Sequence, residues 1–378
     1  MIERFKINYG DNMKNTICSA VALMCGIAGA TATTNANAQT SVQIYGIVDS
    51  GIARMTNVNS AGDSITKVPS LTSSFPSRIG FRGTEDLGGG LQAFFVLENG
   101  LAMDTGSQQQ GGRLFGRAAN LGLKGAWGTV TLGRQQNMTY ISGLKTDVLG
   151  PHLFAIGSID PYLPNARSDN AIGYMGNFSG FVLGATYSLG RDASAAGGPA
   201  ATNCGGEVPG NSKACRQYTG LIGYETKAFG LNASYDRMYG NTGAAGGLAS
   251  SANTDIRTTV NGYLMLGPTK LGGGVIAREL NAAAGRTESN LYYFGASHPI
   301  GAFTVDAQVA RRDTKNSDSD VDMLVARLTY AMSKRTFVYT AIGRMDNDGT
   351  SAVALDAGGT VGAGLAQTGV MVGLRHHF

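Results

Sequence analysis

Apolar and polar residues alternate along most of the chain beyond residue 40. The pattern is clearest in residues 303–309, where one parity is apolar and the other polar: Phe303, Val305, Ala307 and Val309 against Thr304, Asp306 and Gln308. Residues 42–52 and 370–378 alternate in the same way. Alternation over about ten residues is typical of transmembrane β-strands, whereas the strands of a soluble sandwich are usually about 5–6 residues long. The pattern therefore predicts membrane-spanning strands.

Turn signals divide the chain into hairpins. Short clusters rich in Gly, Pro, Asn and Lys occur near residues 86–90, 125–128, 177–180, 226–230, 267–272, 298–302 and 332–335. Longer polar connections lie near residues 55–76, 101–112, 135–167, 191–216, 240–255, 281–288, 313–319 and 345–367. Seven turns and eight loops join sixteen strands, an even number that closes an antiparallel sheet with both termini at one rim. We expect an all-β fold, a sixteen-stranded antiparallel transmembrane β-barrel, which is wide enough to leave an aqueous channel.

Composition agrees with this expectation. Glycine accounts for 56 of 378 residues, and so much glycine disfavours a helical bundle. Charged residues make up 15 % of the chain and the formal net charge is only +4, which argues against a nucleic-acid-binding protein. With 43 % hydrophobic residues the chain is also unlike a disordered one.

The N-terminus has the pattern of an export signal. Lys14 precedes an apolar stretch from Ile17 to Ala30, and Ala36-Asn37-Ala38 is a small-x-small cleavage site. We expect residues 1–38 to comprise a short extension (residues 1–12) and a secretory signal peptide, and residues 39–378 to form one barrel domain. Two cysteines then remain, Cys204 and Cys215, in a loop rich in Gly, Pro and Asn. In an oxidising compartment this pair favours a disulfide in the fourth external loop over a metal site, which needs more ligands.

Five segments resemble the general porins of β-proteobacteria. In order along the chain they are SVQIYGIVDSG (41–51), SRIGFRGTEDLGGG (77–90), LFGRAANLG (114–122), GTVTLGRQ (128–135) and the closing GLRHHF (373–378). The resemblance implies an outer-membrane diffusion channel for small hydrophilic solutes and ions in a Gram-negative bacterium. It also implies a homotrimer in contact with outer-membrane lipid and lipopolysaccharide, and a third loop folded inward to narrow each pore. Phe378 resembles the terminal residue of the signal read by the barrel-assembly machinery.

The chemistry expected of such a channel is electrostatic. Arg78 lies on the side of its strand that carries Arg82, opposite Ile79 and Phe81, so it should point into the lumen. By resemblance, Arg78, Arg117 and Arg167 match the basic positions of the pore constriction. Weaker lumen candidates are Arg54, Arg82, Lys124 and Arg134.

The third loop, from about Gln136 to Asn165, contains only two acidic residues, Asp147 and Asp160. They are the candidates to face the arginines, the alternative being turn-forming aspartates. Porins of this family often carry a Pro-Glu-Phe-Gly element here, where this chain has Asp160-Pro161. Three arginines against two aspartates favour anions.

Other functions find less support. The chain has no G-x-S-x-G motif and no Gly-Lys pair, hence no P-loop. The residues suggest no cofactor, metal site or catalytic group, so we expect no enzyme. A substrate-specific channel and a surface adhesin remain the alternatives to a general diffusion channel.

Overall fold

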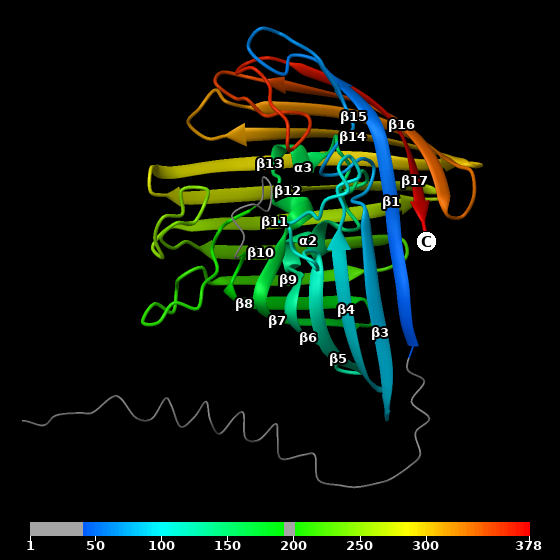
Figure 1. The fold of residues 1–378 in the computed structure, drawn as a ribbon, viewed down its shortest axis with the longest axis vertical. Helices are drawn as coiled ribbons and strands as arrows, with labels where there is room; N and C mark the ends of the chain where they lie inside the picture. Colours follow the sequence, from blue (N-terminus) through cyan, green and yellow to red (C-terminus); the bar gives the residue numbers. More distant parts are fainter. Residues whose placement is uncertain (1–40, 193–200) are drawn as a thin grey trace, which may run out of the picture. The chain divides into compact units, whose positions relative to one another are not determined.

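A computed structural model describes residues 41–192 and 201–378; the predicted signal peptide lies outside them. Sixteen long strands and one short strand, β2, form a single sheet (Figure 1). The first half comprises β1 (Ser41–Met55), β2 (Ile65–Lys67), β3 (Arg78–Gly88), β4 (Leu91–Gly100), β5 (Ala118–Gly125), β6 (Gly128–Gln136), β7 (Arg167–Phe178), β8 (Phe181–Gly190) and β9 (Gln217–Glu225). The second half comprises β10 (Phe229–Tyr239), β11 (Thr254–Leu266), β12 (Thr269–Ala282), β13 (Gly285–Ile300), β14 (Phe303–Thr314), β15 (Val321–Ala331), β16 (Thr336–Asn347) and β17 (Gln367–His377).

The sheet closes on itself through its first strand. β1 pairs antiparallel with β3 over residues 41–47 and with β17 over residues 47–55. All other neighbours are consecutive and antiparallel, and β2 pairs only with the end of β1. The predicted sixteen-stranded antiparallel barrel is therefore confirmed, with β2 a short addition inside the first long connection. No helix in the described ranges is long and apolar enough to cross a membrane.

The connections follow the predicted alternation of short and long, with one exception. Each of the seven predicted turns joins two strands, and Gly180 and Gly267 adopt the positive φ values (94° and 58°) that such turns favour. The expected long loop at residues 281–288 is wrong. β12 ends at Ala282 and β13 begins at Gly285, so these strands form one long hairpin. We call the end of the barrel with the predicted short turns the turn rim and the opposite end the loop rim.

Alternation along each strand produces two different faces. Outward side chains are large and apolar, for example Leu231 and Ile222, which are 61 % and 60 % exposed. Aromatic pairs border this band near the turn rim. The ring centres of Phe181 and Tyr224 are 4.9 Å apart, and those of Phe303 and Tyr330 are 4.8 Å apart. An apolar band flanked by aromatic residues is the lipid-facing surface of an outer-membrane barrel.

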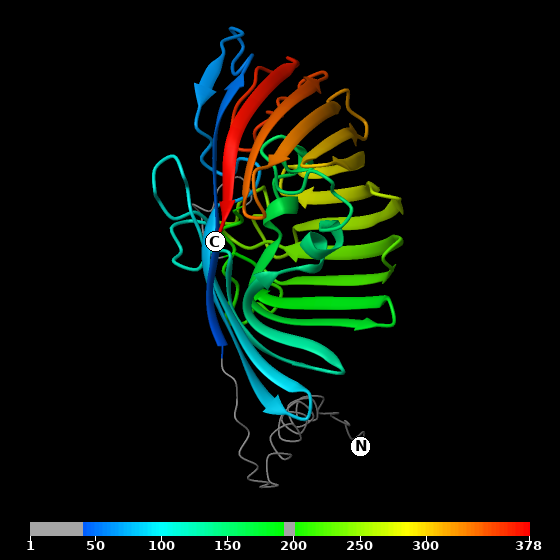
Figure 2. The same ribbon diagram turned by 90° about the vertical axis from the view of Figure 1, so that its right-hand side faces the viewer.

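The inner face is partly apolar as well. Inward residues of β12–β17 and β1, among them Met345 and Val325, pack against Phe154 and Leu153 of the connection between β6 and β7. Leu355, in the connection between β16 and β17, joins the same cluster and is fully buried. Helices α2 (Met138–Gly143) and α3 (Ile156–Ile159) belong to the connection between β6 and β7. Figure 2 shows them against the inside of the strands. On the β12–β17 side the barrel interior is therefore filled by packed loop side chains.

The two cysteines and the terminal phenylalanine have defined places in the fold. Cys204 and Cys215 are joined by a disulfide in the connection between β8 and β9, the fourth long loop, as predicted. The backbone N–H of Phe378 donates to the Gly46 carbonyl (3.2 Å), and the Gly46 N–H donates to the Phe378 carbonyl (3.1 Å). The terminal residue thus completes the seam between β17 and β1; its role as an assembly signal stays a prediction.

Candidate functional site

The connection between β6 and β7, residues 137–166, is hereafter loop 3. It begins with a cap: the Asn137 side-chain oxygen accepts hydrogen bonds from the N–H groups of Thr139 (3.2 Å) and Tyr140 (3.4 Å) and so starts α2. Met138 then packs against the inward residues Val182 and Leu221. The local sequence therefore starts α2 and attaches it to the barrel wall.

Asp236, on the inward face of β10, holds both ends of loop 3. Its carboxylate accepts hydrogen bonds from the Thr139 hydroxyl (2.8 Å) and the Tyr162 hydroxyl. The Gln217 amide donates to the same carboxylate (2.8 Å) and to the Tyr162 oxygen (2.6 Å). Two guanidinium groups lie over the Tyr162 ring, that of Arg191 at 4.8 Å and that of Arg257 at 4.3 Å from the ring centre. One buried carboxylate thus fixes residues at the beginning and at the end of the loop.

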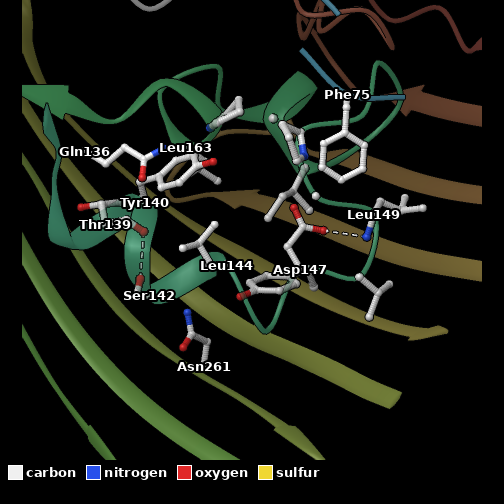
Figure 3. Close-up of a pocket in the computed structure, with 18 of the residues that line it drawn as sticks. Phe75, Gln136, Thr139, Tyr140, Ser142, Leu144, Asp147, Leu149, Leu163 and Asn261 are labelled. Carbon is white, nitrogen blue, oxygen red and sulfur yellow. Dashed lines mark hydrogen bonds between the residues drawn. The ribbon is translucent and has the colours of Figure 1, made fainter. Parts of the chain in front are cut away.

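A cavity of about 470 Å³ lies between loop 3 and the wall (Figure 3). On one side it is lined by Arg78, Arg117 and Glu98. Glu98 lies between the two arginines: its oxygens are 2.6 Å from Arg117 Nε and 3.4 Å from Arg78 Nε. Tyr45 also donates to Glu98 (3.0 Å). The two arginines are therefore only partly neutralised, by one shared carboxylate.

The far side of this cavity adds two more cations, Lys270 and Arg327. Arg327 pairs with Asp306 (2.8 Å) and donates to the loop 3 carbonyls of Leu149 (3.1 Å) and Val148 (3.4 Å). The charged lining residues are thus four basic (Arg78, Arg117, Lys270, Arg327) and two acidic (Glu98, Asp147), a formal excess of 4 − 2 = +2. The lining as a whole presents positive charge.

A second cavity, of about 320 Å³, shares four lining residues with the first: Arg117, Pro151, Gly157 and Pro164. Its other walls come from the connections between β1 and β3, β4 and β5, and β16 and β17. The two cavities therefore meet where Arg117 faces loop 3.

Arg167 lies behind this surface. It is 2 % exposed and does not line the cavity. Its Nε donates to the Arg117 carbonyl (3.0 Å), and its guanidinium lies 5.9 Å from the ring centre of Tyr140. Arg167 thus supports the backbone that carries Arg117 and does not itself form the lining.

The expectation that both loop 3 aspartates face the predicted arginines is wrong for Asp160; Asp147 lines the same cavity as Arg78 and Arg117 but pairs with neither of them. Asp160 accepts two hydrogen bonds from Arg257 of β11, from Nε (2.8 Å) and Nη2 (3.1 Å). Asp147 accepts from the Gln308 amide (2.8 Å) and the Leu149 N–H (3.1 Å). The two carboxylates are thus held by side chains of β11 and β14 and not by the predicted arginines.

The surroundings of the two carboxylates differ. Burial opposes ionisation of Asp160, but the charges of Arg257 and Arg278 outweigh this effect and lower its pKa to about 2. Burial raises the pKa of Asp147, which the Gln308 hydrogen bond offsets only in part. Asp160 is therefore the firmly ionised carboxylate of loop 3.

The pKa of Asp160 in the folded protein lies below its ordinary value. The Asp160–Arg257 pair therefore stabilises the fold at any pH above the ordinary pKa, and this stabilisation is lost only as the pH falls towards 2. We expect loop 3 to stay attached at this point down to about pH 4. Asp160→Asn should loosen it at neutral pH by about 1–3 kcal/mol, seen as faster protease cleavage within residues 137–166. The exposed Asp348→Asn is the control. Equal cleavage of both variants would show that the pair does not anchor the loop.

The weaker lumen candidates divide into two groups. Arg82 and Lys124 lie on the inward face near the turn rim, where Arg82 donates to Gln43 (3.0 Å). Arg54 is exposed and shares the outward parity of Ile52, so its placement in the lumen is wrong. Arg134 has the parity of exposed Leu132, and it pairs with Asp169 and the Gly116 carbonyl (2.7 Å), so its lumen placement is also wrong. Strand parity, not charge, decides which arginines reach the lumen.

Several important residues were missed in the sequence: Glu98, Asp236, Arg257, Lys270 and Arg327. All lie on inward positions of strands. Parity counted from the outward apolar residues of each strand would have placed them in the lumen. The resemblance drew attention to the matched arginines only.

Comparisons with known proteins decide the family. A family model described as Gram-negative porin matches residues 20–350. The chain belongs to the Gram-negative porin family. This porin is 32 % identical to outer membrane porin protein 32 of Delftia acidovorans, over 91 % of this chain and 95 % of that protein. It is 33 % identical to an outer membrane porin protein of Bordetella pertussis, over 97 % of this chain and all of that protein.

A solved structure, the anion-selective porin from Comamonas acidovorans, superposes on this porin with a TM-score of 0.70. The two proteins share 28 % sequence identity, and the superposition covers 90 % of this chain and all of the Comamonas porin. Family and fold are those of an outer-membrane diffusion channel of Gram-negative bacteria. The predicted family, function class and location are confirmed.

Proposed function

We propose that this porin prefers anions and that its selectivity is set where Arg117 faces loop 3. The observation that carries the proposal is the +2 excess of the charged lining residues, two of which, Arg78 and Arg117, share one carboxylate. Charges fixed on a low-dielectric wall act strongly on ions in a narrow passage. The anion-selective porin from Comamonas acidovorans, 28 % identical, supports the same preference.

In this proposal loop 3 is the inward-folded loop that narrows the pore. Its ties to Asp236, Arg257 and Arg327 hold it across the lumen at three points of the wall. No bond-making chemistry is involved: the arginines attract anions, and the loop sets the size of what passes. Small hydrophilic solutes and inorganic anions are the expected permeants.

The test is the reversal potential of the purified protein in a planar bilayer across a KCl gradient. We expect the sign that indicates chloride over potassium, and a smaller preference in concentrated salt because ions screen the arginines. A reversal potential of zero, or one of the sign that indicates potassium over chloride, would contradict the proposal. A current blocked by one organic solute at low concentration would instead indicate the substrate-specific alternative.

We also propose that the porin is a homotrimer whose contact includes β1. The outward face of β1 exposes Val42, Ile44 and Ile52 by 61 %, 64 % and 56 %. Light scattering in mild detergent, corrected for bound detergent, should give three times the mass of the chain. Introducing Ile44→Arg should release monomers, because a charge at a packed apolar contact is costly to bury. A monomeric wild-type protein would contradict this prediction.

A further inference from the structure

The second cavity, of about 320 Å³, differs in chemistry from the first. We call it the outer cavity, because its walls come from four connections at the loop rim and the long loops of an outer-membrane barrel face outwards. Among the described residues, its charged lining consists of Arg117 and Asp356, whose formal charges cancel, 1 − 1 = 0. The first cavity carries an excess of +2. The outer cavity is therefore not built to attract ions of either sign.

Both charged groups of the outer cavity already have partners within the protein. Lys67 of β2 forms an ion pair with the Asp356 carboxylate, which also accepts from the Gly358 N–H (3.1 Å). Asp356 is 2 % exposed. Arg117 donates from Nε to Glu98 (2.6 Å). A ligand of this cavity thus needs no charge of its own.

A buried histidine of loop 3, His152, lines the outer cavity with an unused ring nitrogen. It is 4 % exposed, and its Nδ1 lies 3.0 Å from both the backbone nitrogen and the carbonyl oxygen of Phe154. Nε2, on the other edge of the ring, has no hydrogen-bond partner within residues 41–192 and 201–378. Burial and the charge of Arg327 lower the pKa of His152 to about 3, so the ring stays neutral.

An amide of the β4–β5 connection provides a second unused group. Gln110 lines the outer cavity and donates from Nε2 to the Gln109 side-chain oxygen (3.3 Å), whereas its own Oε1 has no donor in the part of the chain that the structure describes. The apolar side chains of Leu71, Leu153 and Pro164 lie in the same lining. A few fixed polar groups among apolar ones are typical of small-molecule sites, whose volumes begin at about 300 Å³.

The two unused groups indicate the chemical class of the ligand. Gln110 Oε1 can only accept a hydrogen bond, and His152 Nε2 donates in one neutral tautomer and accepts in the other. A hydroxyl group donates and accepts, so it satisfies both groups whichever tautomer is present. A carboxylate has no proton to donate to Gln110. The lining therefore favours an uncharged ligand with several hydroxyl groups on a small carbon skeleton.

We propose that the outer cavity binds a neutral sugar of one ring before the sugar enters the constriction. Its hydroxyl groups bond to His152 Nε2 and Gln110 Oε1, and its C–H groups lie against the apolar side chains. The outer cavity meets the first cavity at Arg117, so the bound sugar lies at the entrance of the passage. Such a site adds a solute class to the proposed channel. It rests on that function only for the route of the sugar, because binding can be measured without transport.

The test is saturation-transfer difference NMR of D-glucose with the purified porin in lauryldimethylamine oxide, a detergent that contains no sugar. A titration gives the half-saturating concentration of glucose. His152→Asn keeps an amide near the position of Nδ1 but has no atom at that of Nε2, so it should raise this concentration about tenfold. His298→Asn is the matched control. It makes the same change at a histidine that bonds to Thr269 (2.8 Å) and lies outside the cavity lining, and it should change the value less than about twofold.

Three results would overturn the proposal. The first is the same half-saturating concentration in His152→Asn as in the wild type. The second is a wild-type glucose signal that does not saturate. The third is tighter binding of sodium gluconate than of D-glucose, which would make the outer cavity an anion site.

A second variant keeps the proposal testable if His152→Asn does not fold. Gln110→Met keeps the length of the side chain, removes the Oε1 acceptor and should raise the half-saturating concentration of D-glucose about fivefold. An unchanged value would again overturn the proposal. The reversal potential in KCl without sugar should be that of the wild type in both variants, because neither changes a charge. Failure of sugar binding would therefore leave the proposed anion preference untouched.

Discussion

Replacing Arg78 and Arg117 by serine should remove the channel's preference for anions and raise its permeability to cations. The structure makes this more than a loss of charge, because Glu98 lies between the two guanidinium groups. The wild-type group carries +2 − 1 = +1, and the double variant leaves the carboxylate alone at −1. Two unit charges about 4 Å apart interact by about 1 kcal/mol in bulk water and about 4 kcal/mol at an effective dielectric of 20. Even the smaller figure shifts an anion-to-cation ratio about fivefold.

The reversal potential in a dilute KCl gradient measures this change, since the Debye length is about 10 Å at 0.1 M and only about 3 Å at 1 M. Adding Glu98→Gln to the double variant is the sharpest control. It removes the stranded carboxylate and should restore part of the preference for anions, whereas Glu98→Gln alone should strengthen that preference. If the double variant keeps the wild-type potential, Lys270 and Arg327 on the opposite wall are the filter.

The barrel could be predicted in detail because its signals are local. Alternation fixes which face of a strand meets lipid, and glycine and asparagine mark the turns, so each predicted short turn lies between two strands. The one misread connection, residues 281–288, shows where local signals fail. Arg286 bridges Glu279 and Glu288 at 2.8 and 2.7 Å, so charged side chains typical of a loop lie on paired strands.

The site could be predicted only where strand parity decides it. Arg78 lines the cavity as its parity requires, and the same rule places Glu98 inward, although its partnership with two arginines became visible only in the fold. Loop 3 is different. Asp160 meets Arg257, 97 residues further along the chain, and no local pattern encodes that contact. Arg54 and Arg134 were misplaced because charge was weighed above parity.

The second large effect concerns Asp236, the residue that joins the two ends of loop 3. Its carboxylate accepts from Thr139 at the start of the loop and from Tyr162 near its end, as well as from Gln217 on β9. Asp236 is 2 % exposed, so water cannot replace it. Removing one partner of such a group leaves buried donors unsatisfied, at a cost of about 1–3 kcal/mol for each.

Asp236→Asn should therefore release loop 3 while the strands stay paired. We expect larger and noisier single-channel currents in planar bilayers, because a loop free to move no longer holds the constriction at one width. Ser234→Ala is the matched control: Ser234 lies on the same face of β10 and makes one neutral hydrogen bond to Ser142 of α2 (3.1 Å). Its loss should cost about 1 kcal/mol and leave the current steady. Tyr162→Phe removes only the hydroxyl that Asp236 accepts from, and it provides the test if Asp236→Asn fails to assemble. Steady, wild-type currents from both Asp236→Asn and Tyr162→Phe would mean that the apolar packing of Phe154 and its neighbours, not this carboxylate, keeps the loop in place.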